Sequence, residues 1–389
     1  IAQCLVGSEM CIRDRSLHIK ESMKKPLNFL VAPDKFRGSL SAAQASHAIR
    51  MGISSAIPNA TITEFSLTDG GDSFVDTVAK VKKGAKVIRL KTIDPTGQTL
   101  TAKCALLDDE TALVGLTEAS GINLISESDR NPATLTNIGS GNILAKLVER
   151  GYKTIIVGVG GSATNDGGIG LLIPLGFKFL DEKGQPIEPN GRGLAKLAEI
   201  VPPENPIPAR FIVATDVDIP LLGEHGAALQ FARQKGANDS EIKELEANMK
   251  RLTEISQKCL GKSLHESPGS GSAGGCGYGL INFLGAKRVS GFELFAEYAN
   301  LDKFVKECNV LVTGEGKFDK TDSQGKGPYL LAKMAEKHKK HIWILCGTSD
   351  VSEKDLEEMK LSDVKIGEIA KIAPNIIAVS YTHLTLPTI

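Results

Sequence analysis

Short loops that combine glycine with a carboxylate follow the predicted strands along this chain. Glycine lets main-chain N–H groups approach a bound phosphate closely, and carboxylates bind Mg²⁺ or accept a proton from a hydroxyl. Together with cationic side chains, these are the groups that phosphoryl transfer from a nucleotide requires. Asp and Gly are also common turn residues, but their recurrence after successive strands favours a shared function. These loops span residues 34–39, 69–72, 160–168 and 314–316, and a fifth loop at 216–218 carries two carboxylates without a glycine.

Specific roles follow from the residue types in these loops. The loop at 160–168 (GGSATNDGG) offers main-chain donors and hydroxyls to a phosphate, and the loop at 34–39 offers cations. The residues predicted to be catalytic are Asp34, Arg37, Asp69, Asp166 and Asp216. The residues predicted to bind substrate or phosphate are Lys35, Ser39, Gly70, Gly71, Gly160, Gly161, Ser162, Thr164, Asn165, Gly314 and Gly316. The candidate Mg²⁺ ligands are Asp166, Asp216 and Glu315.

Some of these segments also fit other roles. Asp72 and Asp166, each taken alone, fit a helix N-cap as well as a catalytic role. Residues 268–279 (PGSGSAGGCGYG) fit either a flexible linker or a second phosphate-binding loop, and composition alone favours the linker. Residues 158–163 (GVGGSA) match the dinucleotide pattern G-x-G-x-x-A after a strand, so an NAD(P)-dependent oxidoreductase stays open as an alternative.

The elements that carry these loops alternate between strand and helix. Residues 27–32 (LNFLVA) form a short apolar run that indicates a buried strand, and a capping box at 41–44 begins the helix after it. The same alternation recurs at 143–159 and at 309–346. It predicts an α/β fold with a doubly wound parallel sheet, whose ligands lie at the carboxyl ends of the strands.

Other segments predict a second domain. Alternating apolar residues flank a turn at 94–97, so residues 86–117 are expected to form a β-hairpin. Residues 241–255 are expected to form a charged helix with one apolar face. A chain of 389 residues also exceeds what one hydrophobic core usually organises. We therefore expect a discontinuous first domain at 24–85, 128–175 and 295–378, and an inserted α/β domain at 86–127 and 176–294.

Composition narrows the function classes. Lys+Arg and Asp+Glu both number 46, so no nucleic-acid or membrane partner is expected. No apolar run reaches the roughly 18–20 residues that span a bilayer, and no signal peptide is recognisable. The 7 cysteines are dispersed without zinc spacing, which is typical of reduced thiols in a cytoplasmic protein. Residues 1–22 and 379–389 do not continue the neighbouring pattern and are expected to be non-native tails.

Taken in order, the loop motifs resemble those of the bacterial-type glycerate kinases. The matching segments are APDKFRGSLSA (32–42), TDGGDSFVD (68–76), EASG (118–121), GVGGSATNDGGIG (158–170), ATDVDIPLLG (214–223) and TGEGKFD (313–319). The resemblance implies a flavodoxin-like or Rossmann-like domain with an inserted second α/β domain. It also implies ATP and Mg²⁺ as cofactors and D-glycerate as the substrate, with 2-phosphoglycerate the favoured product. A homodimer is one expected assembly.

The chain departs from the family pattern at a few positions. Lys35 stands where the family usually has Ser, Arg37 where it has Lys, and Asp72 where it has Glu. After Glu315, either of two residues, 319 and 322, is the equivalent of the family's next acid. The rival hypotheses are the oxidoreductase and a sugar-acid-binding regulator that has lost catalysis.

Overall fold

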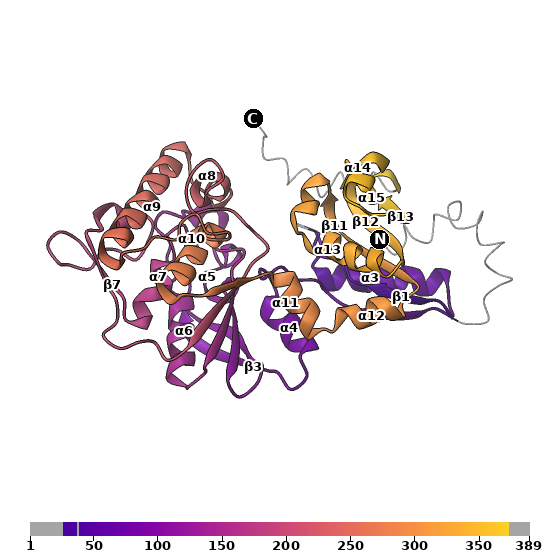
Figure 1. Cartoon of the computed structure of the whole chain (residues 1–389), viewed down its shortest axis with the longest axis horizontal. Helices are drawn as coiled ribbons and strands as arrows, with labels where there is room; N and C mark the ends of the chain where they lie inside the picture. The colour runs from indigo at the N-terminus through magenta and orange to yellow at the C-terminus, as the bar shows by residue number, and fades with distance from the viewer. Residues whose placement is uncertain (1–25, 37–38, 373–389) are drawn as a thin grey trace. The chain divides into compact units, whose positions relative to one another are not determined.

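The computed structural model describes residues 26–36 and 39–372. The expected non-native tails therefore lie outside the described residues, and so does Arg37. The chain divides into two compact units, shown in Figure 1. Unit 1 contains the chain up to Leu67 and again from Asn300, whereas unit 2 spans Thr68–Ala299 without interruption. Unit 2 is thus inserted into unit 1, as expected, although the division falls at other residues.

Unit 1 is built on a five-stranded parallel sheet. Its strands in spatial order are β13 (Val364–Glu368), β12 (His341–Ser349), β11 (Val310–Phe318), β1 (Asn28–Val31) and β2 (Thr61–Glu64). Numbered along this unit alone, the order is 2-1-3-4-5, which is that of flavodoxin-like sheets. The predicted flavodoxin-like domain is confirmed.

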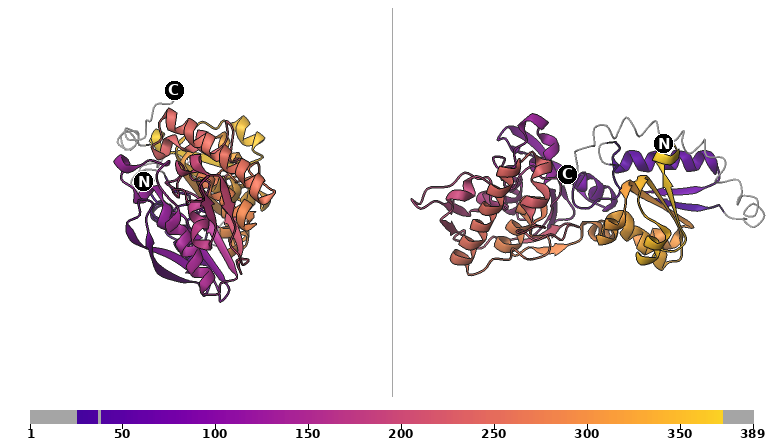
Figure 2. Two further views of the ribbon diagram at one scale, coloured as in Figure 1. Left: turned by 90° about the vertical axis from the view of Figure 1, so that its left-hand side faces the viewer. Right: turned by 90° about the horizontal axis from the view of Figure 1, so that it is seen from above.

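Helices of unit 1 bury one apolar face against this sheet. The capping box between Ser41 and Gln44 starts α3 (Ala42–Ala56), whose Ile49 and Ile53 pack with Phe29 of β1. Figure 2 shows α3 lying along the strands. The remaining helical segments are α12 (Leu301–Glu307), η7 (Lys320–Gln324), α13 (Gly327–Lys337), α14 (Glu353–Glu358) and α15 (Ile369–Ile372).

Unit 2 is built on a six-stranded mixed sheet. Its order is β10 (Lys287–Val289), β9 (Arg210–Ala214), β6 (Thr154–Gly158), β5 (Thr111–Gly115), β4 (Thr99–Leu106) and β3 (Lys86–Ile93). The first four strands run parallel, and β3, β4 and β5 form antiparallel pairs. The hairpin predicted around residues 94–97 is thereby confirmed. A separate antiparallel pair joins β7 (Lys178–Leu180) to β8 (Glu199–Val201).

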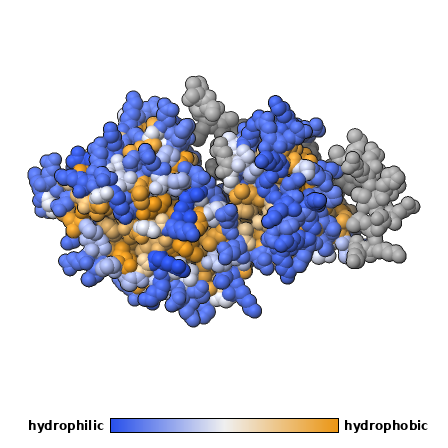
Figure 3. Space-filling model, in the orientation of Figure 1, coloured by the Kyte–Doolittle hydropathy of each residue, from blue (hydrophilic) through white to orange (hydrophobic). Residues whose placement is uncertain are grey.

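The helices of unit 2 are mostly short. They are α4 (Phe74–Val81), α5 (Thr117–Ser120), α6 (Ile138–Glu149), α7 (Ile169–Leu172), α8 (Ala227–Phe231), α9 (Asp239–Leu260), α10 (Ser272–Tyr278) and α11 (Gly291–Tyr298). The predicted charged helix is α9, which buries Leu245, Met249 and Leu252. Its other face is polar, and Figure 3 shows mainly hydrophilic residues over this part of the surface. Among the described helices, none combines the length and the apolar character needed to cross a membrane.

The structure divides the chain differently from the sequence-based expectation. Residues 128–175 were assigned to the first domain because they repeat its strand and helix alternation, yet they belong to unit 2. The reason is pairing: β6 lies between β5 and β9 and pairs with both in parallel. Local periodicity identifies a buried strand, but it does not identify the strand's neighbours in the sheet.

Candidate functional site

The Asp69–Asp72 loop of unit 2 packs directly on the carboxyl ends of the parallel strands. A Cβ added at Gly70 would lie 2.6 Å from the carbonyl oxygen of Ala214, the last residue of β9. A Cβ added at Gly160 would lie 2.7 Å from the Cα of Gly71. These approaches leave no space for side chains, so the glycines bring three loops together at one sheet edge. This is the edge at which open α/β sheets bind ligands.

Two of the predicted catalytic carboxylates meet at this edge. Asp216 accepts hydrogen bonds from Ser290 Oγ at 2.5 Å and from the Phe292 main-chain N–H at 3.0 Å. Burial raises the pKa of Asp216 to about 7, and the negative charge of Asp69 acts in the same direction. Asp69 accepts a hydrogen bond from the Gly71 N–H at 3.0 Å. A carboxyl group with a pKa near 7 is suited to accept a proton from a substrate hydroxyl.

The predicted phosphate loop presents little of its length to solvent. Gly161 is exposed and Gly160 partly so, whereas residues 162–168 are all buried. A Cβ added at Gly161 would lie 3.4 Å from Asp72 Oδ1, so the exposed end of the loop belongs to the same sheet edge. Ser162, Thr164 and Asn165 were predicted to bind substrate, but they lie behind this exposed end.

Asp166 also lies on the inner side of the loop. Its carboxylate is fully buried and accepts hydrogen bonds from the Gly168 N–H at 3.0 Å, the Gly170 N–H at 3.3 Å and Asn137 Nδ2 at 2.8 Å. Burial raises its pKa. These bonds stabilise the turn that leads into α7, and the enclosed carboxylate does not reach a ligand at the loop surface. Asp166 therefore bonds to the first turn of α7 without being its N-cap, which is Gly168, and its predicted role as a metal ligand stays a prediction.

Residues 158–163 lack the structural context that dinucleotide binding requires. In that fingerprint the pyrophosphate sits at the N-terminus of a helix that begins inside the glycine motif. The motif at 158–163 ends β6, but the next helix, α7, starts only at Ile169 and is 4 residues long. The sequence pattern is present without the helix that gives it a function.

The second glycine-rich segment, residues 268–279, is a packing element. The backbone of Thr164 packs against Gly274 so closely that a Cβ on Gly274 would overlap the Thr164 carbonyl oxygen. The Gly274 carbonyl accepts a hydrogen bond from the Gly167 N–H at 3.1 Å. Ala273, Gly274 and Gly275 adopt left-handed backbone angles, which turn the chain against the first loop. Because Gly274 and Gly275 are buried, this part of the 268–279 segment is neither a flexible linker nor exposed to a ligand.

Replacing Gly274 by Ala is expected to lower the free energy of unfolding by about 2–5 kcal/mol, from left-handed strain and overpacking together. Gly261 provides a matched control because its φ is 69° against 68° for Gly274, yet nothing lies within 4 Å of its added Cβ. Gly261→Ala should therefore cost only the backbone strain, about 1–2 kcal/mol. Urea unfolding of both variants measures the difference. Equal losses would mean that the close packing at Gly274 contributes nothing.

Unit 1 contributes a separate group of charged residues. Asp34 follows β1, and its N–H donates to the Gly314 carbonyl at 2.8 Å. Beyond Gly314, β11 continues to Phe318 by pairing with β12, so Gly314 and Gly316 lie in a strand, not in the predicted loop. Burial raises the pKa of Glu315 to about 8, and the charges of Asp322 and Asp34 act in the same direction.

Lys326 partly compensates this acidic group. Its Nζ lies 3.5 Å from Glu315 Oε2 and forms an ion pair with Asp322, whose side chain is fully buried. Asp319 instead caps η7 by accepting a hydrogen bond from the Thr321 N–H at 2.9 Å. Of the two acids that the sequence left open, the one beside Glu315 is therefore Asp322.

The remaining predicted residues and the missed ones can now be placed. Lys35 is partly buried and donates its N–H to Asp34 Oδ1 at 2.7 Å, while Ser39 is exposed. Sequence reasoning missed Ser290, which binds Asp216, because a lone serine before a helix signals only an N-cap. It also missed Lys326, although its position four residues after Asp322 is the spacing of a helical ion pair.

Comparison with known proteins gives a consistent result. The model of the glycerate kinase family matches residues 29–382. A glycerate kinase of Halalkalibacterium halodurans is 37% identical over 324 residues, which are 82% of this chain and 85% of the relative. A glycerate 2-kinase of Escherichia coli (strain K12) is 35% identical over 331 residues, which are 84% of this chain and 87% of the relative. A crystal structure described as a glycerate kinase 2 from Salmonella typhimurium LT2 is 29% identical, with a TM-score of 0.71 and coverage of 92% of this chain and 95% of that one.

Proposed function

The chain belongs to the glycerate kinase family, and we propose from this premise how its residues carry out the reaction. It phosphorylates glycerate, with ATP as the co-substrate. We propose further that the product is 2-phosphoglycerate, in line with the name of the relative called glycerate 2-kinase. We also propose that the substrate is the D-enantiomer, as the resemblance of the loop motifs implies. A cytoplasmic location and a homodimer stay predictions, and light scattering tests the second of them.

We propose that Asp216 is the general base that accepts the proton of the glycerate hydroxyl. The observation that carries this is the burial of the Asp216 carboxylate at the sheet edge, which together with the nearby negative charge of Asp69 raises the pKa of Asp216 to about 7. Gly71, Asp72 and the exposed Gly160–Gly161 surround the same edge and would position the substrate. As the proton leaves the hydroxyl, its oxygen becomes a better nucleophile towards the γ-phosphate.

We propose that Glu315 contributes to Mg²⁺ binding. Glu315 Oε1 is buried and has no hydrogen-bond partner among the described residues, and Asp34 and Asp322 add negative charge nearby. Within the described part of the chain, no cluster of three or more His, Cys, Asp or Glu side chains is arranged to hold a metal. In proteins Mg²⁺ commonly takes one or two carboxylates and completes its shell with phosphate oxygens and water. An ion held there would neutralise negative charge on a nucleotide phosphate.

The role of Asp216 predicts a pH dependence. The base must be ionised to accept a proton, and the pKa of Asp216 is raised to about 7. We therefore expect kcat/KM for glycerate to increase about tenfold per pH unit on the acidic side and to level off above neutrality. Rates are measured between pH 5 and 9 at saturating ATP. A flat profile from pH 5 to 7 would exclude Asp216 as the base.

The reaction itself is tested by measuring ADP release with D-glycerate, L-glycerate and tartronate as acceptors. Phosphorus NMR of the product distinguishes 2-phosphoglycerate from 3-phosphoglycerate. We expect ADP release that depends on D-glycerate and a product phosphorylated at the 2-position. ADP release that is indifferent to the added acid would contradict the proposed substrate, and a 3-phosphorylated product would contradict the proposed position alone.

A further inference from the structure

A lysine that the predicted site did not include lies directly behind the exposed end of the Gly160–Gly168 loop. Lys235 ends the short helix η5 (Arg233–Lys235) and is 5% exposed. Its Nζ donates to Ser162 Oγ at 2.9 Å and to the Thr164 carbonyl at 2.6 Å. Both acceptors belong to the loop, so one ammonium group fixes two residues on either side of Ala163.

Burying the ammonium group of Lys235 is unfavourable in free energy, which indicates that its position serves a function. Burial lowers the pKa of Lys235 to about 8, and the carboxylate of Asp166 opposes this shift. Asn137 links the two charges because its Nδ2 donates to Thr164 Oγ1 at 2.6 Å and to Asp166 Oδ1 at 2.8 Å. The inner side of the loop is thus a connected polar network, and Lys235 supplies its positive charge.

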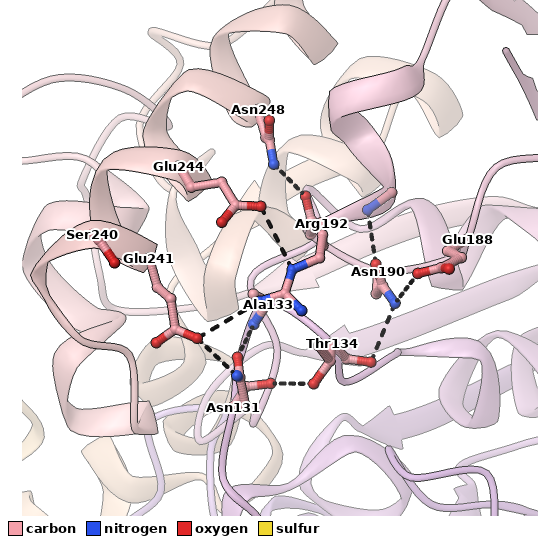
Figure 4. Close-up of polar contacts among 12 residues, drawn as sticks. Asn131, Ala133, Thr134, Glu188, Asn190, Arg192, Ser240, Glu241, Glu244 and Asn248 are labelled. Atoms are coloured by element: carbon pink, nitrogen blue, oxygen red, sulfur yellow. Dashed lines mark hydrogen bonds and ion pairs between the residues drawn. The ribbon is translucent and has the colours of Figure 1, made fainter.

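Neutral groups brace the rest of the loop. The Asn165 N–H donates to the Pro132 carbonyl at 3.0 Å, and the Ala163 N–H donates to the Ser120 carbonyl at 2.8 Å. Figure 4 shows the polar contacts that hold Asn131, Ala133 and Thr134, which flank this proline in the sequence. Asn131 Nδ2 donates to Glu241 at 2.9 Å, and the Arg192 guanidinium lies 3.7 Å from the same carboxylate. These contacts fix the main chain of the loop at Ala163 and Asn165. They do not involve its exposed end, Gly160 and Gly161.

We propose that Lys235 is a positioning residue for the kinase reaction: it holds Ser162 and the Thr164 carbonyl from within, so that Gly160 and Gly161 keep a fixed geometry towards an anionic group of a substrate. This inference rests on the proposed function. The anionic group is either the glycerate carboxylate or an ATP phosphate, and both are recognised by main-chain N–H groups. Lys235 touches neither substrate, since its ammonium is enclosed by the loop.

The test is the steady-state kinetics of Lys235→Met, which keeps the length of the side chain and removes its charge. Loss of hydrogen bonds from a charged donor should raise the KM for one substrate by about 10- to 100-fold, with a smaller change in kcat. Glycerate is varied at saturating ATP, and ATP at saturating glycerate. An increase in the first KM assigns the loop to the carboxylate, and an increase in the second assigns it to the phosphate.

The matched control is Arg233→Met in the same turn, where the side chain is 67% exposed and pairs with Asp239. It should keep both KM values. If Lys235→Met does not fold, Ser162→Ala carries the same test, because it removes one acceptor and keeps the cation. Unchanged KM values with a lower melting temperature would overturn the proposal and leave Lys235 a purely structural residue. Absence of glycerate-dependent ADP release in the unmodified protein would instead contradict the proposed function.

Discussion

Replacing Asp216 by Asn is expected to lower turnover by about a hundredfold or more, which is the usual contribution of a general base. The amide keeps the size of the side chain and one oxygen acceptor for Ser290 Oγ or the Phe292 N–H. It cannot take a proton from the glycerate hydroxyl. The loss should therefore fall on kcat and on kcat/KM alike, whereas a binding contact would change KM alone.

A competing interpretation of Asp216 is that it merely caps α11. The helix begins at Gly291, and Asp216 accepts from its first main-chain donors. Melting temperature and turnover separate the two roles. A stable, folded variant with little turnover supports the base, and a less stable variant with normal turnover supports the cap. Asp218→Asn is the matched control because Asp218 lies in the same loop, is 63% exposed and pairs with Arg288.

The fold could be predicted because its signals are local. The strand at 28–31, the capping box of α3 and the β3–β4 hairpin each follow from a few adjacent residues. The carboxyl-end rule for parallel sheets put Asp69 and Asp216 each at the end of a strand, but the expected domain division assigned them to different domains. The order of the strands was not predictable in the same way, and β6 was consequently assigned to the wrong sheet.

The inner and outer sides of a loop could not be distinguished from the sequence. Residues 160–168 are all small, so the sequence did not separate the members that face a ligand from those that face the interior. Which members are buried depends on distant segments, namely the glycines at 274–275 and the lysine at 235. Lysine side chains are usually solvated, so nothing local distinguished Lys235 from Arg233.

Removing divalent cations is expected to reduce turnover by roughly three orders of magnitude, because a bound Mg²⁺ supplies several kcal/mol of charge stabilisation to a phosphoryl group in transfer. Excess EDTA should abolish ADP formation, and added Mg²⁺ or Mn²⁺ should restore it. ADP is measured directly by chromatography, so that no coupling enzyme responds to the chelator. Undiminished turnover in EDTA would contradict the metal requirement.

The Glu315→Gln variant tests whether Glu315 is a residue that binds the metal. Glu315 becomes a charged ligand by losing its proton as Mg²⁺ binds, whereas the amide of Gln stays neutral. Among the described residues, Glu315 Oε1 has no hydrogen-bond partner that the substitution would break. If Glu315 binds Mg²⁺, the concentration for half-maximal activity should increase about tenfold, while activity at saturating Mg²⁺ changes less. Asp350→Asn is the control, because that carboxylate is 71% exposed and pairs with Lys317. An unchanged Mg²⁺ dependence would instead leave Glu315 as a carboxylate that positions Lys326, since the ammonium lies 3.5 Å from its other oxygen.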